Sequence, residues 1–372
     1  MKRNAKINKI ALLLYGLHGG GAERIMVTLA NEWVRQGIAV DFLVGIMEGP
    51  YQTLLHKDLN IFVFNKRIKG LLPHVIQYLN QHQPDILLST IQPVNVIAAL
   101  AGKCSHAKTK IVLREANSPG QKLVYRKGFL SKLYFRLLPR FSYPFADGYV
   151  SVSEGLRQEM IQFYNMDGYK IRTIYNPVVN NELYELAQMP IDHPVLQGEE
   201  DIIMAMGRVV PQKDFITLIR AFALVRKKRN CKLIILGKTD FDQTYYDSLL
   251  ELARDLGVEE NIHFIGFQTN PFAFLKRASV YVLSSRFEGL PGALIQALAL
   301  GCRVVSTDCE HGPSEILKKG EYGILVPIGK PEAMANAIEK SFTLPQIDMT
   351  EIIQSYHHSK GTQEYLDYFE SL

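Results

Sequence analysis

The chain has only four cysteines among its 372 residues, and no two of them form a C-x-x-C pair. The scatter of Cys104, Cys231, Cys302 and Cys309 argues against a zinc ribbon or a redox motif, so we expect reduced thiols. The sequence also lacks any run near the ~20 apolar residues of a spanning helix. The apolar run 10–15 is too short for a signal peptide and ends in a glycine loop. We therefore expect a cytoplasmic protein.

Several nucleotide and metal signatures are missing as well. No G-x-x-x-x-G-K-[ST] motif occurs, and a G-x-G-x-x-G frame starting at Gly19 meets Arg24 where its third glycine belongs. No D-x-D motif stands in a loop position that we expect to hold a metal ion, and we predict no metal and no cofactor. The formal net charge of +5 is a modest bias, which does not by itself argue for nucleic acid, and we expect none as a partner.

The order of apolar and helical segments predicts an α/β protein with two domains. A chain of this length exceeds one ordinary core. Buried-strand patterns alternate with helical patterns, which is typical of doubly wound parallel sheets. We predict one domain over 1–180 and a second over 198–345, with a polar linker between them. Residues 346–372 are expected to form a C-terminal helix that packs back on the first domain.

The strongest site signal follows the apolar run 278–284. Glu288, Gly289 and Leu290 stand in the loop after this predicted strand, and Pro291 suits the first turn of the helix that comes next. Ligands of open α/β sheets bind at the carboxyl ends of strands, and helix starts favour anions. Glu288 is therefore a candidate for ligand hydroxyls, although a carboxylate here could also merely cap the helix.

A second signal follows the predicted strand 201–206. Gly207 and Arg208 come directly after it, and Lys213 stands five residues beyond Arg208, before a helix. An arginine fork and a lysine point charge at a helix start suit a diphosphate. The alternative is a pair of solvated surface cations.

Polar loops also follow two predicted strands of the first domain. The loop 16–21 includes His18, Gly20 and Gly21, and its glycines allow a ligand to approach the backbone closely. A plain tight turn would have the same composition. Arg114, Glu115 and Asn117 cluster at the end of the predicted strand 111–114, and with His18 they are candidates for ligand contacts.

Residues 121–144 combine basic and aromatic side chains, and no acid occurs between Gln121 and Ala146. This pattern predicts a helical stretch that either lies on an anionic membrane or packs as a core helix with a solvated basic face.

Several blocks resemble retaining glycosyltransferases of family 4, which have the GT-B fold. Glu288-Gly289-Leu290-Pro291 followed by Gln296 is similar to the family's E-G-[FL]-P…E block. The other similar blocks are Gly20-Gly21-Ala22-Glu23-Arg24, Gly207-Arg208 with Lys213, and the T-D-x-x-x-G-P-x-E-I-L block at 307–317. This chain has Gln296 where the family has its second glutamate, and Ala116 where it often has a histidine.

The resemblance implies two Rossmann-like domains that face a cleft, with the acceptor on the first and a nucleotide sugar on the second. The candidates for acceptor contacts are His18, Arg114, Glu115 and Asn117. It implies catalytic or donor contacts for Arg208, Lys213 and Glu288, and a ribose contact for Gln296. The remaining implied donor contacts come from Gly20, Gly21, Gly207, Gly266, Phe267, Gly289 and Leu290.

The implied reaction is transfer of a hexosyl or N-acetylhexosaminyl unit, with retention, from a UDP-sugar to a glycan or polyprenyl-linked acceptor. This would serve the synthesis of cell-surface polysaccharide, lipopolysaccharide or lipid-linked glycan, with the enzyme on the inner face of the cytoplasmic membrane. The alternatives are a GT-B nucleotide-sugar epimerase and a nucleotide-sugar-binding protein with weakened catalysis.

Overall fold

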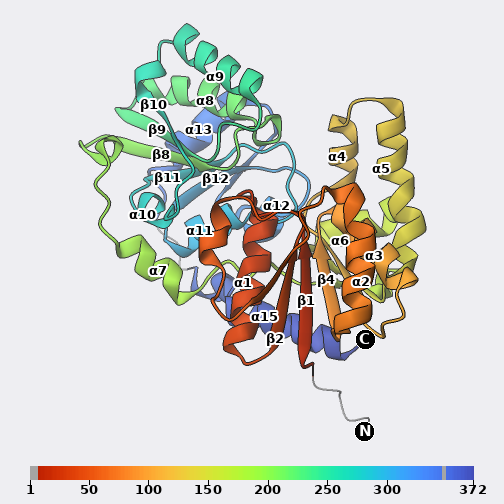
Figure 1. The fold of residues 1–372 in the computed structure, drawn as a ribbon. Coiled ribbons are helices and arrows are strands. Elements are labelled where there is room, and N and C mark those ends of the chain that lie inside the picture. Colours follow the sequence, from red (N-terminus) through yellow and green to blue (C-terminus); the bar gives the residue numbers. More distant parts are fainter. Residues whose placement is uncertain (1–6, 346–348) are drawn as a thin grey trace. The chain divides into compact units, whose positions relative to one another are not determined.

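The computed structural model describes residues 7–345 and 349–372, and these residues form two compact units (Figure 1). The first unit comprises the chain up to Pro177 together with His358–Leu372, and the second is Val178–His357. The chain therefore passes between the units twice. In the second unit the N–H of Val178 donates to the carbonyl of Tyr356 at 3.1 Å, so the two connections leave this unit side by side.

A parallel seven-stranded sheet in the order β3-β2-β1-β4-β5-β6-β7 organises the described part of the first unit. Its strands are β1 (Lys9–Leu14), β2 (Ala39–Val44), β3 (Asn60–Val63), β4 (Ile86–Thr90), β5 (Lys110–Glu115), β6 (Gly148–Ser151) and β7 (Ile171–Thr173). Its α-helices are α1 (Gly21–Arg35), α2 (Leu71–His82), α3 (Gln92–Cys104), α4 (Pro119–Tyr125), α5 (Phe129–Ser142), α6 (Glu154–Tyr164) and α15 (His358–Glu370). Central strands such as β1 are apolar almost throughout, because parallel strands are covered on both faces.

The last helix, α15, belongs to the first unit through a buried aromatic cluster. The ring of Trp33, on α1, meets the rings of Tyr365 and Phe369 edge-on, at centroid distances of 6.0 and 5.8 Å. The indole N–H of Trp33 donates to the carbonyl of Thr362 at 3.4 Å. Because aromatic pairs stabilise beyond their buried area, these contacts hold residues more than 300 positions apart in one core.

The second unit has a parallel six-stranded sheet, among its described residues, in the order β10-β9-β8-β11-β12-β13. Its strands are β8 (Asp201–Met206), β9 (Cys231–Leu236), β10 (Ile262–Gly266), β11 (Val280–Leu283), β12 (Arg303–Thr307) and β13 (Ile324–Val326). Its α-helices are α7 (Asn181–Gln188), α8 (Phe215–Arg226), α9 (Gln243–Asp255), α10 (Phe272–Leu275), α11 (Gly292–Ala299), α12 (Pro313–Ile316), α13 (Pro331–Ser341) and α14 (Thr350–Gln354).

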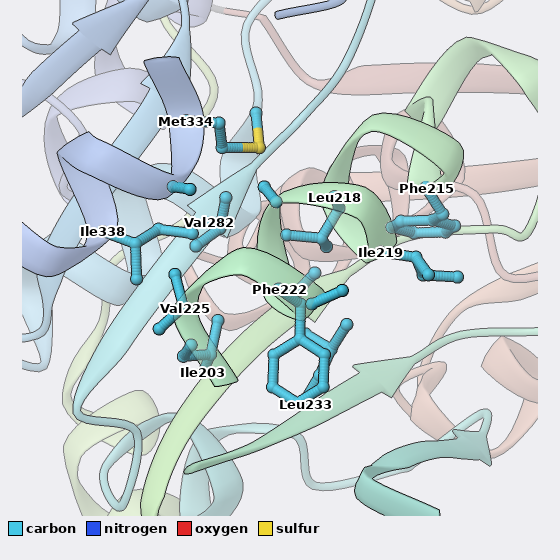
Figure 2. Close-up of a cluster of buried hydrophobic side chains, with 14 of the residues drawn as sticks. Ile203, Phe215, Leu218, Ile219, Phe222, Val225, Leu233, Val282, Met334 and Ile338 are labelled. Atoms are coloured by element: carbon cyan, nitrogen blue, oxygen red, sulfur yellow. The ribbon is translucent and has the colours of Figure 1, made fainter. Parts of the chain in front are cut away.

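A hydrophobic cluster between α8, α13 and this sheet forms the core of the second unit (Figure 2). Phe222 of α8 is fully buried there, near Leu233 of β9. Met334 and Ile338 of α13 are also fully buried, one helical turn apart. Truncating a fully buried phenylalanine to alanine lowers the free energy of unfolding by about 3–5 kcal/mol. This core therefore stabilises the positions of β8 and β9, which the loops at their carboxyl ends follow.

Three expectations about local structure need correction. The segment predicted as a linker contains α7, which packs on α10 within the second unit. The predicted C-terminal helix is two helices: α14 belongs to the second unit, and only α15 to the first. The stretch 121–144 is not one long helix, because Gly128 adopts φ +85° between α4 and α5. A backbone in this left-handed region ends a helix, and glycine adopts it without steric cost.

Candidate active site

The strand order of the second unit brings the two strongest sequence signals together. Strands β8 and β11 are neighbours, and the sheet continues away from them in opposite directions. Such a switch point is where open α/β sheets bind ligands. The loop after β8 contains Arg208 and Lys213, and the loop after β11 contains Glu288.

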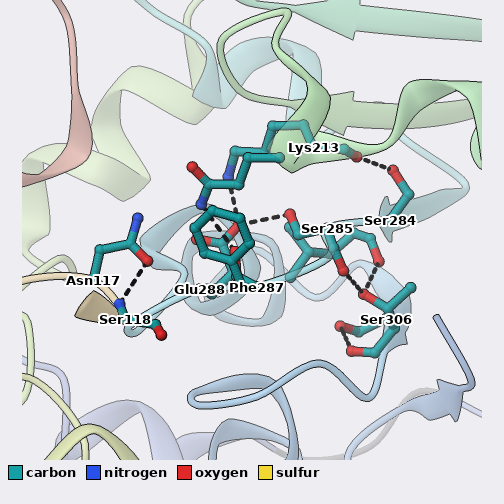
Figure 3. A network of polar contacts seen from close by, with 11 residues as sticks. Asn117, Ser118, Lys213, Ser284, Ser285, Phe287, Glu288 and Ser306 are labelled. Atoms are coloured by element: carbon teal, nitrogen blue, oxygen red, sulfur yellow. Dashed lines mark hydrogen bonds and ion pairs between the residues drawn. The ribbon is translucent and has the colours of Figure 1, made fainter. Parts of the chain in front are cut away.

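An ion pair joins these two loops. Lys213 Nζ lies 2.6 Å from Glu288 Oε1, and the two side chains are 18% and 9% exposed (Figure 3). The hydroxyl of Ser285 donates to the same carboxylate oxygen at 2.6 Å. Charge-assisted bonds of this length are strong, and they fix the position of the Glu288 carboxylate. Glu288 does not cap the following helix, because α11 begins only at Gly292.

Backbone contacts hold the two loops in register. The hydroxyl of Ser284 donates to the carbonyl of Lys213 at 2.6 Å, and the side-chain amide of Gln212 donates to the carbonyl of Phe287 at 2.9 Å. The Thr307 hydroxyl, at the end of β12, donates to the carbonyl of Ser285 at 2.6 Å. Ser284, Ser285 and Gln212 were not among the predicted site residues, because their contacts depend on which strands are neighbours.

Gly207 and Arg208 complete the loop after β8. Gly207 has φ +151°, and a Cβ there would lie 2.7 Å from Cε of Lys213. Glycine is therefore needed for the lysine stem to cross the backbone toward Glu288. Arg208 is exposed, and its guanidinium lies over the ring of Phe241, 5.2 Å from the centroid. This cation–π contact leaves the guanidinium beside the loop rather than inside the ion pair.

The other predicted donor residues of this unit lie on neighbouring elements. Gly289 and Leu290 follow Glu288 and are buried. The amide nitrogen of Gln296, on α11, lies 3.5 Å from the carbonyl of Val178, at the outer limit of a hydrogen bond. Gly266 ends β10 with φ +77°, and Phe267 follows it half-buried.

In the first unit, the glycine loop is closed by its own helix. The carboxylate of Glu23 accepts hydrogen bonds from the N–H groups of Gly19 and Gly20, at 2.9 and 3.1 Å. These two amides therefore already have a hydrogen-bond acceptor within the loop and its helix. Gly21 has open space where a Cβ would stand. The ring of His18 lies against Tyr15, 6.0 Å between centroids.

Arg114 does not fit the predicted acceptor contact, because its side chain is completely buried. Its Nε donates to the Tyr365 hydroxyl at 3.1 Å, and Nη1 donates to the Thr90 hydroxyl at 3.0 Å. Nη2 donates to Oδ1 of Asn176. The guanidinium thus ties β4, β5 and α15 to the segment that leaves the first unit, which is a positioning role inside the protein.

Glu115 is also buried, and Asn117 is half-buried. The Glu115 carboxylate accepts from the Asn95 amide at 3.0 Å and from the Tyr143 and Tyr164 hydroxyls at 3.3 and 3.4 Å. Burial raises the pKa of Glu115 from 4.5 to about 6, against smaller lowering effects from Lys122 and these hydrogen bonds. The Asn117 side chain accepts from the N–H of Ser118 at 2.9 Å (Figure 3).

A small cavity of about 100 Å³ opens at the switch point of the first unit, where β1 and β4 are neighbours. Its lining includes Tyr15, Glu23, Thr90 and Ile91. Ile91 has φ +72°, a conformation that a β-branched residue adopts only under strain. Such strain is often kept at functional sites. The sequence contains no signal for this cavity, because neither a positive φ at isoleucine nor the pairing of β1 with β4 follows from local pattern.

The described residues include no group of three or more histidine, cysteine or acidic side chains placed to hold a metal ion. One D-x-D triplet is present, Asp240 to Asp242, in the loop after β9. The carboxylate of Asp242 accepts from the N–H of Tyr245 at 3.0 Å and so caps α9. Within 7–345 and 349–372, no helix is both long and apolar enough to cross a membrane.

Comparison with known families matches the two units separately. Residues 19–181 match the model described as Glycosyltransferase Family 4, and residues 191–356 match Glycosyl transferases group 1. Together these matches span most of both units. The chain therefore belongs to the glycosyltransferases with the GT-B fold, as the sequence blocks predicted.

Individual relatives agree with this assignment. The chain is 26% identical over 350 residues, covering 90% of each protein, to a Campylobacter jejuni enzyme. That enzyme is N-acetylgalactosamine-N,N'-diacetylbacillosaminyl-diphospho-undecaprenol 4-alpha-N-acetylgalactosaminyltransferase. The present chain is also 26% identical over 270 residues to the lipopolysaccharide 1,6-galactosyltransferase of Escherichia coli, and the match covers 71% of this chain and 67% of that enzyme. The fold is shared with Anabaena HepE in complex with UDP and glucose, at TM-score 0.79, 19% identity and coverage of 98% and 100%.

Proposed function

We propose that this protein is a retaining glycosyltransferase that uses a UDP-sugar. The transferred unit would be a hexosyl or N-acetylhexosaminyl group, and the acceptor a glycan or polyprenyl-linked saccharide. The product would belong to lipopolysaccharide, cell-surface polysaccharide or a lipid-linked glycan. The observation that carries this proposal is the Lys213–Glu288 pair at the β8–β11 switch point, with Arg208 in the same loop as Lys213.

The relatives support the choice of substrates. The Campylobacter enzyme, by its name, adds N-acetylgalactosamine to a saccharide on diphospho-undecaprenol, and the Escherichia coli enzyme is a galactosyltransferase of lipopolysaccharide. HepE, which shares the fold, was solved with UDP and glucose. These names favour a uridine nucleotide as donor and a lipid-linked or lipopolysaccharide acceptor.

The site chemistry suits this reaction. The bond from the anomeric carbon to the UDP oxygen breaks, its electron pair leaves with UDP, and the acceptor oxygen bonds to that carbon and releases its proton. Negative charge grows on the diphosphate during this step. Fixed cations placed at such a charge supply a large share of catalysis, and Arg208 and Lys213 are suited to that part. Glu288, held by Ser285, would orient the sugar hydroxyls.

We propose that no metal ion is required, because the two cations would carry the diphosphate charge. Calorimetric titration with UDP, GDP and ADP in the presence of EDTA tests this together with the nucleotide preference. Of the three nucleotides, only UDP is expected to bind tightly, and it should do so in the presence of EDTA. Binding that appears only after a divalent ion is added would contradict the metal-independent proposal.

Arg208→Ala tests the donor site itself. A hydrogen bond to a charged group contributes about 1.5–3 kcal/mol, so UDP should bind about 10- to 100-fold more weakly. The matched control is Arg220→Ala, because Arg220 is an exposed arginine on α8 of the same unit. Equal effects of the two variants, or wild-type affinity in Arg208→Ala, would remove the diphosphate role from Arg208.

Two departures from the family pattern keep alternatives to a transferase in view. Gln296 stands where the family has a glutamate, and Ala116 where it often has a histidine. A nucleotide-sugar-binding protein with weakened catalysis would bind UDP-sugars without consuming them, and an epimerase would interconvert them without an acceptor. Product analysis with and without a saccharide acceptor separates the three functions.

A further inference from the structure

The hairpin of α4 and α5 carries an unusually apolar surface. Figure 1 shows the two helices side by side, and they contact each other as well as α6. Half of the large hydrophobic side chains that are exposed in the described chain lie between residues 124 and 145. Large exposed apolar patches mark interaction sites in soluble proteins, so this surface calls for a partner.

The rotation of α5 is fixed, which means that its exposed face is a property of the fold. Phe135, Pro139 and Ser142 are buried on the inner face. Pro139 has no N–H to donate to the carbonyl of Phe135 one turn earlier, and the side-chain amide of Gln92 donates to that carbonyl instead, at 2.6 Å. Arg140 donates twice to the carbonyl of Phe163, at 3.1 and 2.9 Å.

The opposite face of α5 is apolar. Phe129 and Leu130 are 78% and 74% exposed, and Tyr134 and Phe141 are 69% and 70% exposed. At about 100° per residue, Leu130, Tyr134 and Phe141 fall within one narrow stripe of the helix. The helix extends about 21 Å at 1.5 Å per residue, so the stripe is long enough to lie along a surface.

Cations lie at one edge of the exposed apolar face, next to Phe129, because Arg136 and Lys132 fall about 20° and about 60° from it at about 100° per residue. Lys132 and Arg136 are exposed, four residues apart on α5, and Lys127 is exposed in the turn before it. Between Gln121 and Ala146 there are six basic residues and no acidic one. A second copy of the chain docking through the same face would place cations against cations, which disfavours a symmetric dimer. An anionic surface with an apolar layer below it complements both features.

We propose that the α4–α5 hairpin docks on an anionic lipid bilayer, with α5 in the plane of the headgroups. Phe129, Leu130, Tyr134 and Phe141 enter the acyl boundary, and Lys132 and Arg136 meet lipid phosphates, as in interfacial amphipathic helices. The hairpin starts directly after Asn117, so docking would hold the predicted acceptor loop near a lipid-linked acceptor. That last link rests on the proposed function, whereas the membrane contact does not.

Vesicle flotation with the full chain tests the proposal. Vesicles of phosphatidylcholine alone are compared with vesicles that also contain phosphatidylglycerol, at low and at high salt. Binding should require phosphatidylglycerol and weaken with salt, because salt screens exposed charges. Equal binding to both vesicle types, or no binding to either, would overturn the proposal.

Two double variants test the surface itself. Each basic residue near an anionic bilayer contributes about a fivefold affinity, so Lys132→Gln with Arg136→Gln should weaken binding about 30-fold. The control with the same loss of charge is Lys227→Gln with Lys228→Gln, two exposed lysines of the second unit. Phe129→Ser with Leu130→Ser should weaken binding at least about 30-fold, whereas Tyr169→Ser, at a 99% exposed side chain, should not.

The controls also distinguish other occupants of the face. Circular dichroism should show wild-type folding of the hairpin variants, since the replaced side chains are exposed. Light scattering tests for a dimer. If the wild-type chain is a dimer that does not bind vesicles, and the double variant Phe129→Ser with Leu130→Ser is a monomer, the face belongs to a second copy and the proposal is overturned. UDP titration of the same samples tests the proposed function separately, because the proposed UDP site does not include residues of the hairpin. Vesicle binding without UDP binding would refute the proposed function and leave the membrane contact in place.

Discussion

Replacing Glu115 with glutamine should make the first unit more stable at neutral pH. Glu115 is 1% exposed, and burial raises its pKa from 4.5 to about 6. Below pH 4.5 both the folded and the unfolded chain hold the proton, and the residue adds no pH dependence. Between these two pKa values the unfolded chain releases a proton that the folded chain keeps. Folding therefore loses stability as pH rises, and the full loss is reached above pH 6.

The size of this loss follows from the two pKa values. Since one pKa unit corresponds to 1.36 kcal/mol, the charged carboxylate of Glu115 destabilises the folded state by about 2 kcal/mol at neutral pH. Glutamine stays neutral and can still accept hydrogen bonds from Asn95 and Tyr143. The unfolding free energy of Glu115→Gln relative to wild type should therefore rise by about 2 kcal/mol between about pH 4 and pH 7.

The chain offers a local reporter for this measurement. Trp33 is the only tryptophan and is fully buried in the first unit. Its fluorescence during urea unfolding follows that unit, and the experiment is repeated across the pH range. Glu48→Gln is the control, because Glu48 is an exposed acid of the same unit. A difference between Glu115→Gln and wild type that stays constant with pH, or that falls as pH rises, would refute this account.

Three further predictions concern other parts of the chain. Tyr365→Phe removes the acceptor of Arg114 Nε inside the first unit, and the Trp33 signal should report a loss of about 1.5–3 kcal/mol; an unchanged midpoint would contradict the positioning role of Arg114. Lys213→Ala leaves the nearly buried Glu288 carboxylate without its cation, so calorimetry should find the second unit destabilised by about 2–4 kcal/mol. The double variant with Glu288→Ala should lose less than the sum of the two single variants, and additivity would speak against the pair. Cys104 is the only exposed cysteine, so one thiol should react quickly with a disulfide reagent in the folded protein and four in urea; a second fast thiol would contradict the burial of the others.

Local pattern was sufficient for much of the fold. Apolar runs bounded by glycines predicted the parallel strands, because buried strands of α/β sheets have a composition that sequence alone reveals. The block around Glu288 and the Arg208–Lys213 spacing predicted loops at strand ends, and the structure has them there. Family resemblance predicted the GT-B class, which the family matches confirm. The roles of the individual site residues stay predictions.

Tertiary structure decided which of these residues meet. Lys213 and Glu288 are 75 positions apart, and they pair only because β8 and β11 are neighbours in the sheet. Arg114 looked like a loop residue suited to a ligand, but α15 returns from the far end of the chain and its Tyr365 covers the guanidinium. Burial, and with it the pKa of Glu115, depends on such non-local packing.

In the hairpin 119–142, too, the sequence determined the composition and the tertiary structure decided which side chains are exposed. Its basic and aromatic composition, without acids, is plain in the sequence and left two interpretations open. The bond from Gln92 to the carbonyl of Phe135 and the buried Pro139 decide which side of α5 faces inward. Sequence thus determined the chemistry available at each segment, because composition and periodicity are local. Only the folded chain decided which side chains are buried, paired or exposed, because those properties depend on partners distant in sequence.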